Sequence, residues 1–195
     1  RAYELQALDI RFKSRPTQPV SKEIVIIEAA NDTIDSLGTW PLNRKYHALL
    51  FDALRYAGAR LVLFDIGLPD KSKETDSYSR EQTGPTSDEM LARAIKRSKN
   101  VLLPIALRYQ YTKEKYKASE EVMGVLDLFR RAAYKIGHVN APPDIDGKVR
   151  SVLPLIYYQS DSVWHLGLIA ASEYLSVSTK DIYIQLGDKI IFGKD

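Results

Sequence analysis

The chain has 195 residues, a hydrophobic fraction of 45% and a net charge of +3, which fits one globular domain or slightly more. Its lysines and arginines are scattered along the chain, so we do not expect nucleic-acid binding, which needs a clustered basic surface. Cysteine is absent, which excludes disulfides, cysteine-containing zinc sites and thiol catalysis.

No stretch of the sequence is long and apolar enough to span a membrane. The longest apolar run, residues 101–107, contains Pro104 and is far shorter than the roughly 20 residues that a transmembrane helix needs. The chain begins with Arg1 instead of methionine, so we interpret it as a piece of a longer protein whose targeting segments lie elsewhere.

The N-terminal part predicts two helices and one buried strand. Apolar residues three or four apart favour a helix over residues 2–13, and two prolines make residues 16–19 an extended connector. The β-branched run at 24–27 is typical of a strand that is buried on both faces. A loop rich in Asp, Asn and Gly follows, and the helical pattern over 44–57 ends at Gly58.

The middle of the chain continues the alternation of strands and helices. Residues 61–64 predict a second buried strand, which ends on Asp65, and residues 70–85 form a polar insert. Thr86 and Glu89 match a capping box, in which two side chains satisfy backbone N–H groups at the start of a helix.

The remaining pattern predicts a third strand over 101–107 and a helix within 119–136, whereas residues 109–117 favour no particular structure. Residues 149–158 are strand-like, and residues 164–175 predict a helix rich in small side chains. The last two apolar segments flank Gly187-Asp188, a dipeptide that favours a β-hairpin with a turn of the primed type.

Together these elements predict the α/β class. Alternating strands and helices in the first half imply parallel strands joined by right-handed crossovers, and the second half adds antiparallel strands. We expect a mostly parallel central sheet with flanking helices in three layers. We also expect residues 1–195 to form a single domain.

Polar side chains follow the first two predicted strands, at the sheet edge where parallel sheets bind ligands. Asp32 follows the first strand and Asp65 ends the second, while Trp40 and Arg44 lie at the start of the helix between them. Two interpretations stay open. Either Arg44 and Asp65 form an ion pair that locks the helix start to the strand end, or these side chains line a polar ligand pocket.

The loop DIDGKVR, residues 144–150, gathers two carboxylates, a glycine and Arg150. An EF-hand calcium loop is excluded, because its fifth position is Lys148 and its twelfth is a leucine. A haloacid-dehalogenase-like phosphohydrolase using Asp144 and Asp146 is not favoured, because prolines interrupt the strand that should precede the loop. The simplest interpretation is an Asp-Gly turn whose carboxylates bind Arg150. If a ligand pocket exists, we expect Asp146 and Arg150 to contribute to it as well.

The sequence shows no catalytic constellation. His47, His138 and His165 are far apart and have no metal-ligand spacing, and His47 is expected to border the core. No glycine-rich phosphate loop or nucleophile motif is present. We therefore expect no enzyme activity in this domain, no cofactor and no metal.

Several of these elements follow one another in an order that resembles a known family. They include Asp-x-Arg-Phe near the N-terminus, Leu-Gly-x-Trp-Pro-x-x-Arg before the second helix, and Asp-x-Asp-Gly-x-x-Arg after Gly-His-Val-Asn. The chain resembles the second type of CHASE domain, the cyclases/histidine kinases associated sensory extracellular domain. The matching segments are residues 9–12, 16–27, 37–44, 47–48, 57–65, 100–104, 137–140 and 144–150.

The resemblance implies an extracytoplasmic, periplasmic sensor of a bacterial transmembrane receptor, whose output is an adenylate or diguanylate cyclase, a histidine kinase or a serine/threonine kinase. The partner would be an unknown small-molecule ligand or a periplasmic protein, and the full-length receptor would be a homodimer. Residues 1–15 would form a membrane-proximal helix, and flanking helices outside this chain would cross the membrane. Family domains continue past residue 195, so we expect truncation at the C-terminus. The alternative is a structural dimerisation module without a ligand.

Overall fold

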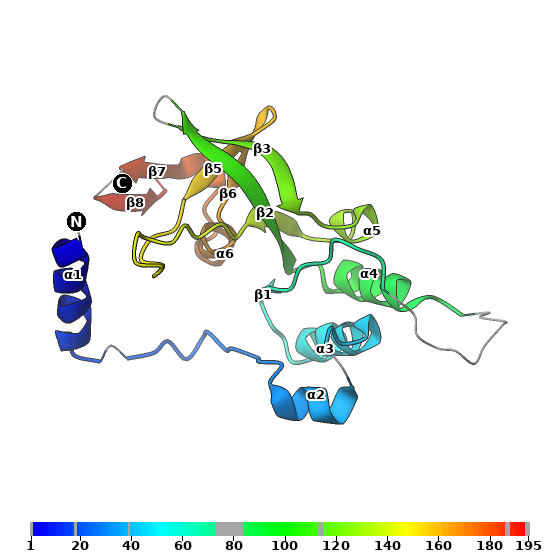
Figure 1. Ribbon diagram of the computed structural model, residues 1–195. Coiled ribbons are helices and arrows are strands. Elements are labelled where there is room, and N and C mark those ends of the chain that lie inside the picture. Colours follow the sequence, from blue (N-terminus) through cyan, green and yellow to red (C-terminus); the bar gives the residue numbers. More distant parts are fainter. Residues whose placement is uncertain are drawn as a thin grey trace. The chain divides into compact units, whose positions relative to one another are not determined.

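The computed structural model describes residues 2–17, 19–38, 40–72, 84–112, 115–185 and 188–193 (Figure 1). They belong to two compact units. Unit 1 combines Arg1–Leu42 with Pro142–Ser151, and unit 2 combines Asn43–Ala141 with Val152–Asp195.

Unit 1 contains the helices α1 (Ala2–Ser14) and α2 (Asn31–Leu37). Helix α1 confirms the predicted N-terminal helix. Helix α2 lies where a loop was expected, because Asn and Asp are more typical of turns and helix caps than of helix interiors. It ends at Gly38, whose φ of 114° is unfavourable for other residues.

The predicted strand at 24–27 is wrong. These residues are extended but not hydrogen-bonded in a ladder within the described part of the chain, and Ile24, Val25, Ile26 and Ile27 are 71%, 77%, 88% and 55% exposed. Branching at Cβ favours an extended backbone, but a strand also needs a neighbouring edge to pair with its N–H and C=O groups. The run therefore shows strand propensity without a strand.

Unit 2 is built on a mixed sheet with the order β1-β2-β3-β5-β6, in which β4 also pairs with β2. Parallel pairs join β1 to β2, β2 to β4 and β3 to β5, whereas β2–β3 and β5–β6 are antiparallel. The strands are β1 (Val62–Leu63), β2 (Val101–Thr112), β3 (Lys115–Met123), β4 (Lys135–His138), β5 (Leu155–Tyr158) and β6 (Asp161–Trp164).

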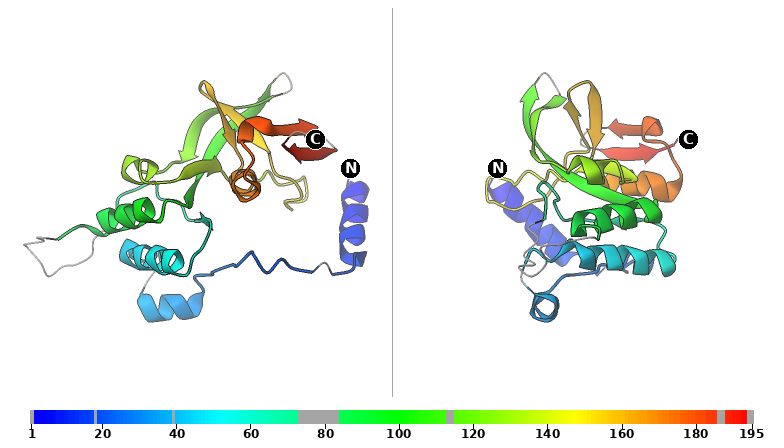
Figure 2. Two further views of the ribbon diagram at one scale, coloured as in Figure 1. Left: turned by 180° about the vertical axis from the view of Figure 1, so that it is seen from behind. Right: turned by 90° about the vertical axis from the view of Figure 1, so that its right-hand side faces the viewer.

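Helices cover both faces of the sheet. On β2, Val101 and Leu103 face a core shared with α3 (Arg44–Tyr56) and α4 (Ser87–Ser98). Leu102 points to the opposite face and packs against α6 (Leu166–Leu175). Figure 2 shows α3 and α4 side by side on one side of β2. This alternation along one buried strand confirms the predicted α/β fold with three layers.

The start of α4 confirms the predicted capping box. The Thr86 hydroxyl accepts from the Glu89 N–H at 3.2 Å, and the Glu89 carboxylate accepts from the Thr86 N–H at 3.0 Å. The strand predicted at 101–107 is also confirmed, and it continues as β2 to Thr112. Residues close together in the sequence were sufficient to predict both the capping box and the strand.

The helix predicted within 119–136 is largely wrong. Residues 119–123 belong to β3 and residues 135–136 to β4, and only the short α5 (Asp127–Arg130) is helical. The Ser-Glu-Glu run there is compatible with a helix, but pairing with β2, for instance Ala118 opposite Tyr109, decides in favour of a strand. Likewise, only Leu155–Tyr158 of the strand-like segment 149–158 is a strand.

The C-terminal part contains the 3-10 turn η1 (Thr179–Asp181) and a separate hairpin of β7 (Ile182–Gln185) and β8 (Lys189–Phe192). The predicted hairpin is confirmed, but its turn includes residues 186–187, which lie outside the described residues. Residues 73–83 of the predicted polar insert lie outside them as well. None of the described helices has the length and apolar character needed to cross a bilayer.

Candidate functional site

The predicted ligand-binding residues are divided between the two units, so their convergence at one rim stays a prediction. Trp40 is 50% exposed, and Asp32 and Asp65 are exposed as well, so these side chains are accessible. Unit 1 contains Asp32, Trp40, Asp146 and Arg150, and unit 2 contains Arg44 and Asp65.

Arg150 is the centre of an ionic cluster in unit 1, which we call the Arg150 junction and which contains Arg150, Lys148, Asp9, Asp144 and Asp146. The guanidinium donates to both Asp146 oxygens at 2.8 and 2.7 Å, and to Asp144 at 2.8 Å. It also donates to both Asp9 oxygens at 2.9 and 3.0 Å. Lys148 lies 2.5 Å from Asp9. The Arg150 side chain is only 9% exposed, so its charge is held by these carboxylates.

These contacts shift the pKa values of three side chains in the Arg150 junction, namely Asp9, Asp146 and Arg150. Hydrogen bonds from Arg150 and then from Lys148 hold the pKa of Asp9 well below its usual range. The hydrogen bond from Arg150 lowers the pKa of Asp146 to about 2. Asp146, followed by Asp9 and Asp144, raises the pKa of Arg150. The carboxyl groups of Asp9 and Asp146 therefore stay ionised at lower pH than a free aspartate does.

The junction confirms the Asp-Gly turn with Arg150 bound to its carboxylates. Gly147 has a φ of 79°, and its N–H donates to the Asp144 carbonyl at 2.9 Å. The sequence interpretation missed Asp9, which belongs to α1 and lies far from the loop along the chain. Because Asp144 and Asp146 both bind Arg150 and follow no strand, neither is placed as the nucleophile of a phosphohydrolase.

Arg44 forms an ion pair, but its partner differs from the one expected. The Arg44 guanidinium lies 2.5 Å from Asp88 at the start of α4 instead of pairing with Asp65. It also donates to the Asp70 carbonyl and lies over the Phe129 ring, 5.0 Å from its centroid. The Arg44 and Asp88 side chains are 12% and 11% exposed. Arg44 thus joins two helix starts, a long-range pairing that sequence spacing does not reveal.

Two of the three histidines meet inside unit 2. His138 is fully buried and its ring centroid lies 5.3 Å from that of His165, an approach made possible by Gly137, which leaves no room for a side chain against α6. Burial, then the neighbouring His165, lowers the pKa of His138 to about 4. His47 is buried against Phe64, as expected for a residue at the core. No group of acidic or histidine side chains in the described ranges is arranged to hold a metal ion.

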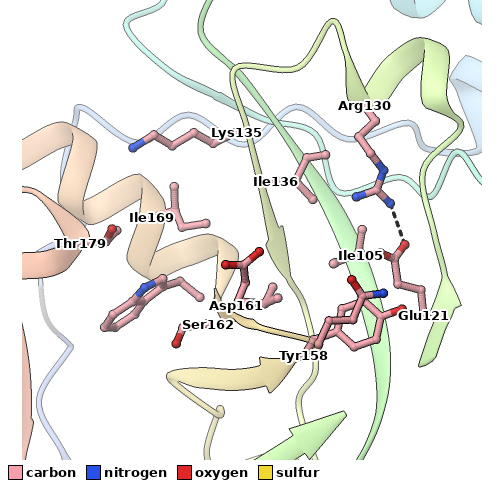
Figure 3. Close-up of a pocket in the computed structure, with 13 residues that line it drawn as sticks. Ile105, Glu121, Arg130, Lys135, Ile136, Tyr158, Asp161, Ser162, Ile169 and Thr179 are labelled. Atoms are coloured by element: carbon pink, nitrogen blue, oxygen red, sulfur yellow. Dashed lines mark hydrogen bonds and ion pairs between the residues drawn. The ribbon is translucent and has the colours of Figure 1, made fainter. Parts of the chain in front are cut away.

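A hollow of about 450 Å³ opens in unit 2 between the β5–β6 hairpin, β4 and α6 (Figure 3). Ile105, Ile136 and Ile169 form its apolar part, and Tyr158 and Trp164 add aromatic surface. Its size is in the range of small-molecule sites. The sequence interpretation missed this hollow, because its lining comes from segments that are separated along the chain.

The charged side chains of the hollow have unequal environments. Arg130 donates to Glu121 at 2.7 Å, and Lys135 forms an ion pair with Glu173. Asp161, by contrast, has no ion pair or side-chain hydrogen bond to the rest of the described structure. Among the described residues of the lining, Asp161 is therefore an exposed carboxylate without an ion-pair partner.

Comparison with known proteins identifies the family. The sequence model of the CHASE2 domain matches residues 1–194, almost the whole chain. No curated protein and no solved structure matches significantly. CHASE2 domains are extracellular sensor domains of signalling receptors and are sensory rather than catalytic. The ordered motifs, the α/β fold and the match over 1–194 lead to one conclusion: this chain belongs to the CHASE2 domain family.

Proposed function

We propose that this chain is the periplasmic ligand-sensing part of a bacterial transmembrane receptor whose output is a cyclase, a histidine kinase or a serine/threonine kinase. Membership of a sensory family supports this proposal. Ligand binding would act by shifting the receptor between two conformations.

The observation that carries the proposal is the Arg150 junction. It joins α1, the first helix of the chain, to the loop 144–150 through one guanidinium and three carboxylates. A receptor needs such a connection, because a change in the folded part must reach the segment that leads to the membrane. Our candidates for contact with the ligand, or for transmission of the signal, remain Asp32, Trp40, Arg44, Asp65, Asp146 and Arg150.

Replacing Arg150 by glutamine tests this role. We expect protease cleavage within 142–151 to accelerate several-fold, because Asp9, Asp144 and Asp146 lose their common partner. In the full-length receptor, output should become insensitive to the stimulus. The matched control is Arg108→Gln, which removes an exposed pair with Glu120 in unit 2 and should change neither readout. Unchanged cleavage and a normal response in the Arg150 variant would contradict the proposal.

A screen tests ligand sensing itself. Metabolites that raise the thermal midpoint of the chain are added to the full-length receptor, and cyclase or kinase output is measured. Binding that stabilises the folded state must shift the midpoint by mass action. If every stabilising compound leaves the output unchanged, sensing by ligand binding is refuted.

The exposed run at 24–27 favours the second candidate, a dimerisation module without a small-molecule ligand. Four adjacent β-branched side chains in contact with water are typical of a protein interface. We expect Ile26→Asp to weaken self-association in sedimentation experiments at least tenfold, because Ile26 is 88% exposed and a charge there opposes burial. Val20→Asp, at an isolated exposed position, is the control. A monomer at every concentration would eliminate this candidate.

A further inference from the structure

The charges around the hollow of unit 2 indicate which ligands it accepts. Both cations on its lining are engaged by glutamates, Arg130 by Glu121 and Lys135 by Glu173. Asp161 is the remaining acidic side chain of the lining, and none of the described residues forms an ion pair with it. A cationic ligand would compensate this charge, whereas an anionic ligand would be repelled by it.

Asp161 is positioned by a hairpin with a two-residue turn. It is the first residue of β6 and lies opposite Tyr158 in the β5–β6 hairpin. The two-residue turn between them includes Gln159 with a φ of 54°, as hairpin turns of the primed type require. In Figure 3 the Asp161 carboxylate stands in the open middle of the hollow, whereas Arg130 and Lys135 stand at its margins. The carboxylate is thus presented by a tight turn to the space that a ligand would occupy.

The rest of the lining suits the body of an amine. Ile105, Ile136 and Ile169 offer apolar contact, and Trp164, the last residue of β6, adds an aromatic ring to the lining. Aromatic rings attract organic cations through their quadrupole, most strongly in the case of tryptophan. One carboxylate, one indole and an apolar wall are a complementary set for an ammonium group attached to an apolar or aromatic body.

We propose that this hollow binds a small organic amine, with its ammonium group on Asp161 and its apolar part against the isoleucines and Trp164. This inference rests on the proposed sensory function and names the chemical class of the ligand. The volume of about 450 Å³ accommodates a molecule of metabolite size.

The test uses two probes of the same shape and opposite charge, phenethylamine and 3-phenylpropionate. The full chain contains two tryptophans, so its NMR spectrum has two indole N–H signals, and a Trp164→Phe sample identifies the one from Trp164. We expect phenethylamine to shift the Trp164 signal saturably and 3-phenylpropionate to leave it unchanged. Asp161→Asn should weaken phenethylamine binding about tenfold or more, because a charge-assisted hydrogen bond is lost.

Asp188→Asn removes the same charge from an exposed position before β8 and should leave the affinity unchanged. Equal binding of both probes, no binding of phenethylamine, or full affinity in the Asp161 variant would each overturn the inference. Receptor output separates it from the proposed function. If amines bind without changing output, sensing at this site fails but the amine site stands. If other compounds control output while the hollow stays empty, the proposed sensory function stands but the amine site fails.

Discussion

Arg44→Ala is expected to lower the free energy of unfolding by about 3–5 kcal/mol, because it leaves a buried carboxylate without its partner. Among the described residues, Asp88, whose side chain is 11% exposed, would keep the weak contacts from the Ser72 N–H at 3.2 and 3.3 Å. The Asp70 carbonyl would lose its donor and Phe129 its stacked guanidinium. Urea unfolding followed by circular dichroism measures the change.

A surface pair on the same two helices provides the control. Arg97 of α4 binds Asp52 of α3 at 2.7 Å, but its side chain is 50% exposed. Arg97→Ala should therefore cost less than about 1 kcal/mol. Equal costs for the two variants would show that Arg44 is not a structural lock. If Arg44→Ala has the same free energy of unfolding as the wild type and the receptor loses its response, Arg44 is a ligand-contact residue instead.

The stability of unit 2 is expected to fall as the pH decreases from about 6.5 to about 4, since His138 is buried in its neutral form. The pKa of His138 is about 4 in the folded chain and near 6.5 in the unfolded chain, so only the unfolded chain binds a proton in this window. The contribution of neutral His138 to stability is fully present above the pKa of the unfolded chain, near 6.5, and decreases as the pH falls below it. The difference between the two values corresponds to about 3 kcal/mol.

The pKa shifts of the two other histidines act in the same direction. Burial also lowers the pKa of His47 and of His165, although Asp65 opposes the effect on His165. The pKa values of Asp9 and Asp146, in unit 1, lie below this window. The contribution of His138 to the pH dependence of the unfolding free energy is therefore obtained only by comparing the wild type with a variant that lacks His138.

His138→Leu provides this comparison. The His138 Nε2 has no hydrogen-bond partner among the described atoms, and its Nδ1 accepts only from the Asn140 N–H at 3.3 Å, so an apolar side chain of similar size costs one long hydrogen bond. The free energy of unfolding is measured between pH 4.5 and 7 in urea, and we expect its slope to be clearly smaller in the variant. Identical slopes would mean that His138 binds its proton equally well in the folded and the unfolded chain, so that burial does not lower its pKa.

Local chemistry made parts of this fold predictable. The capping box of Thr86 and Glu89 and the Asp-Gly turn at Gly147 depend on residues within a few positions of each other. The helical period over α3 and the buried apolar run at the start of β2 likewise identify an element from its own residues. In such cases the interactions that stabilise the element are made within it, so the local sequence is sufficient to predict the element.

The ordered motifs were sufficient for the family as well, since they depend on residue identity and not on spatial neighbours. Pairing across the chain was not predictable. Strand β3 exists because β2 offers it an edge, and the run at 24–27, with higher strand propensity, has no such edge among the described residues.

The candidate site depends on the same kind of distant pairing. The sequence predicted Asp65 as the partner of Arg44, and only the placement of α4 shows that the partner is Asp88. Asp9 joins Arg150 across most of the sequence, and the hollow around Asp161 collects separate segments. The sequence by itself determined the elements and the family, whereas the tertiary structure decided which charges meet, because ion pairs and cavities form between segments that chain folding brings together.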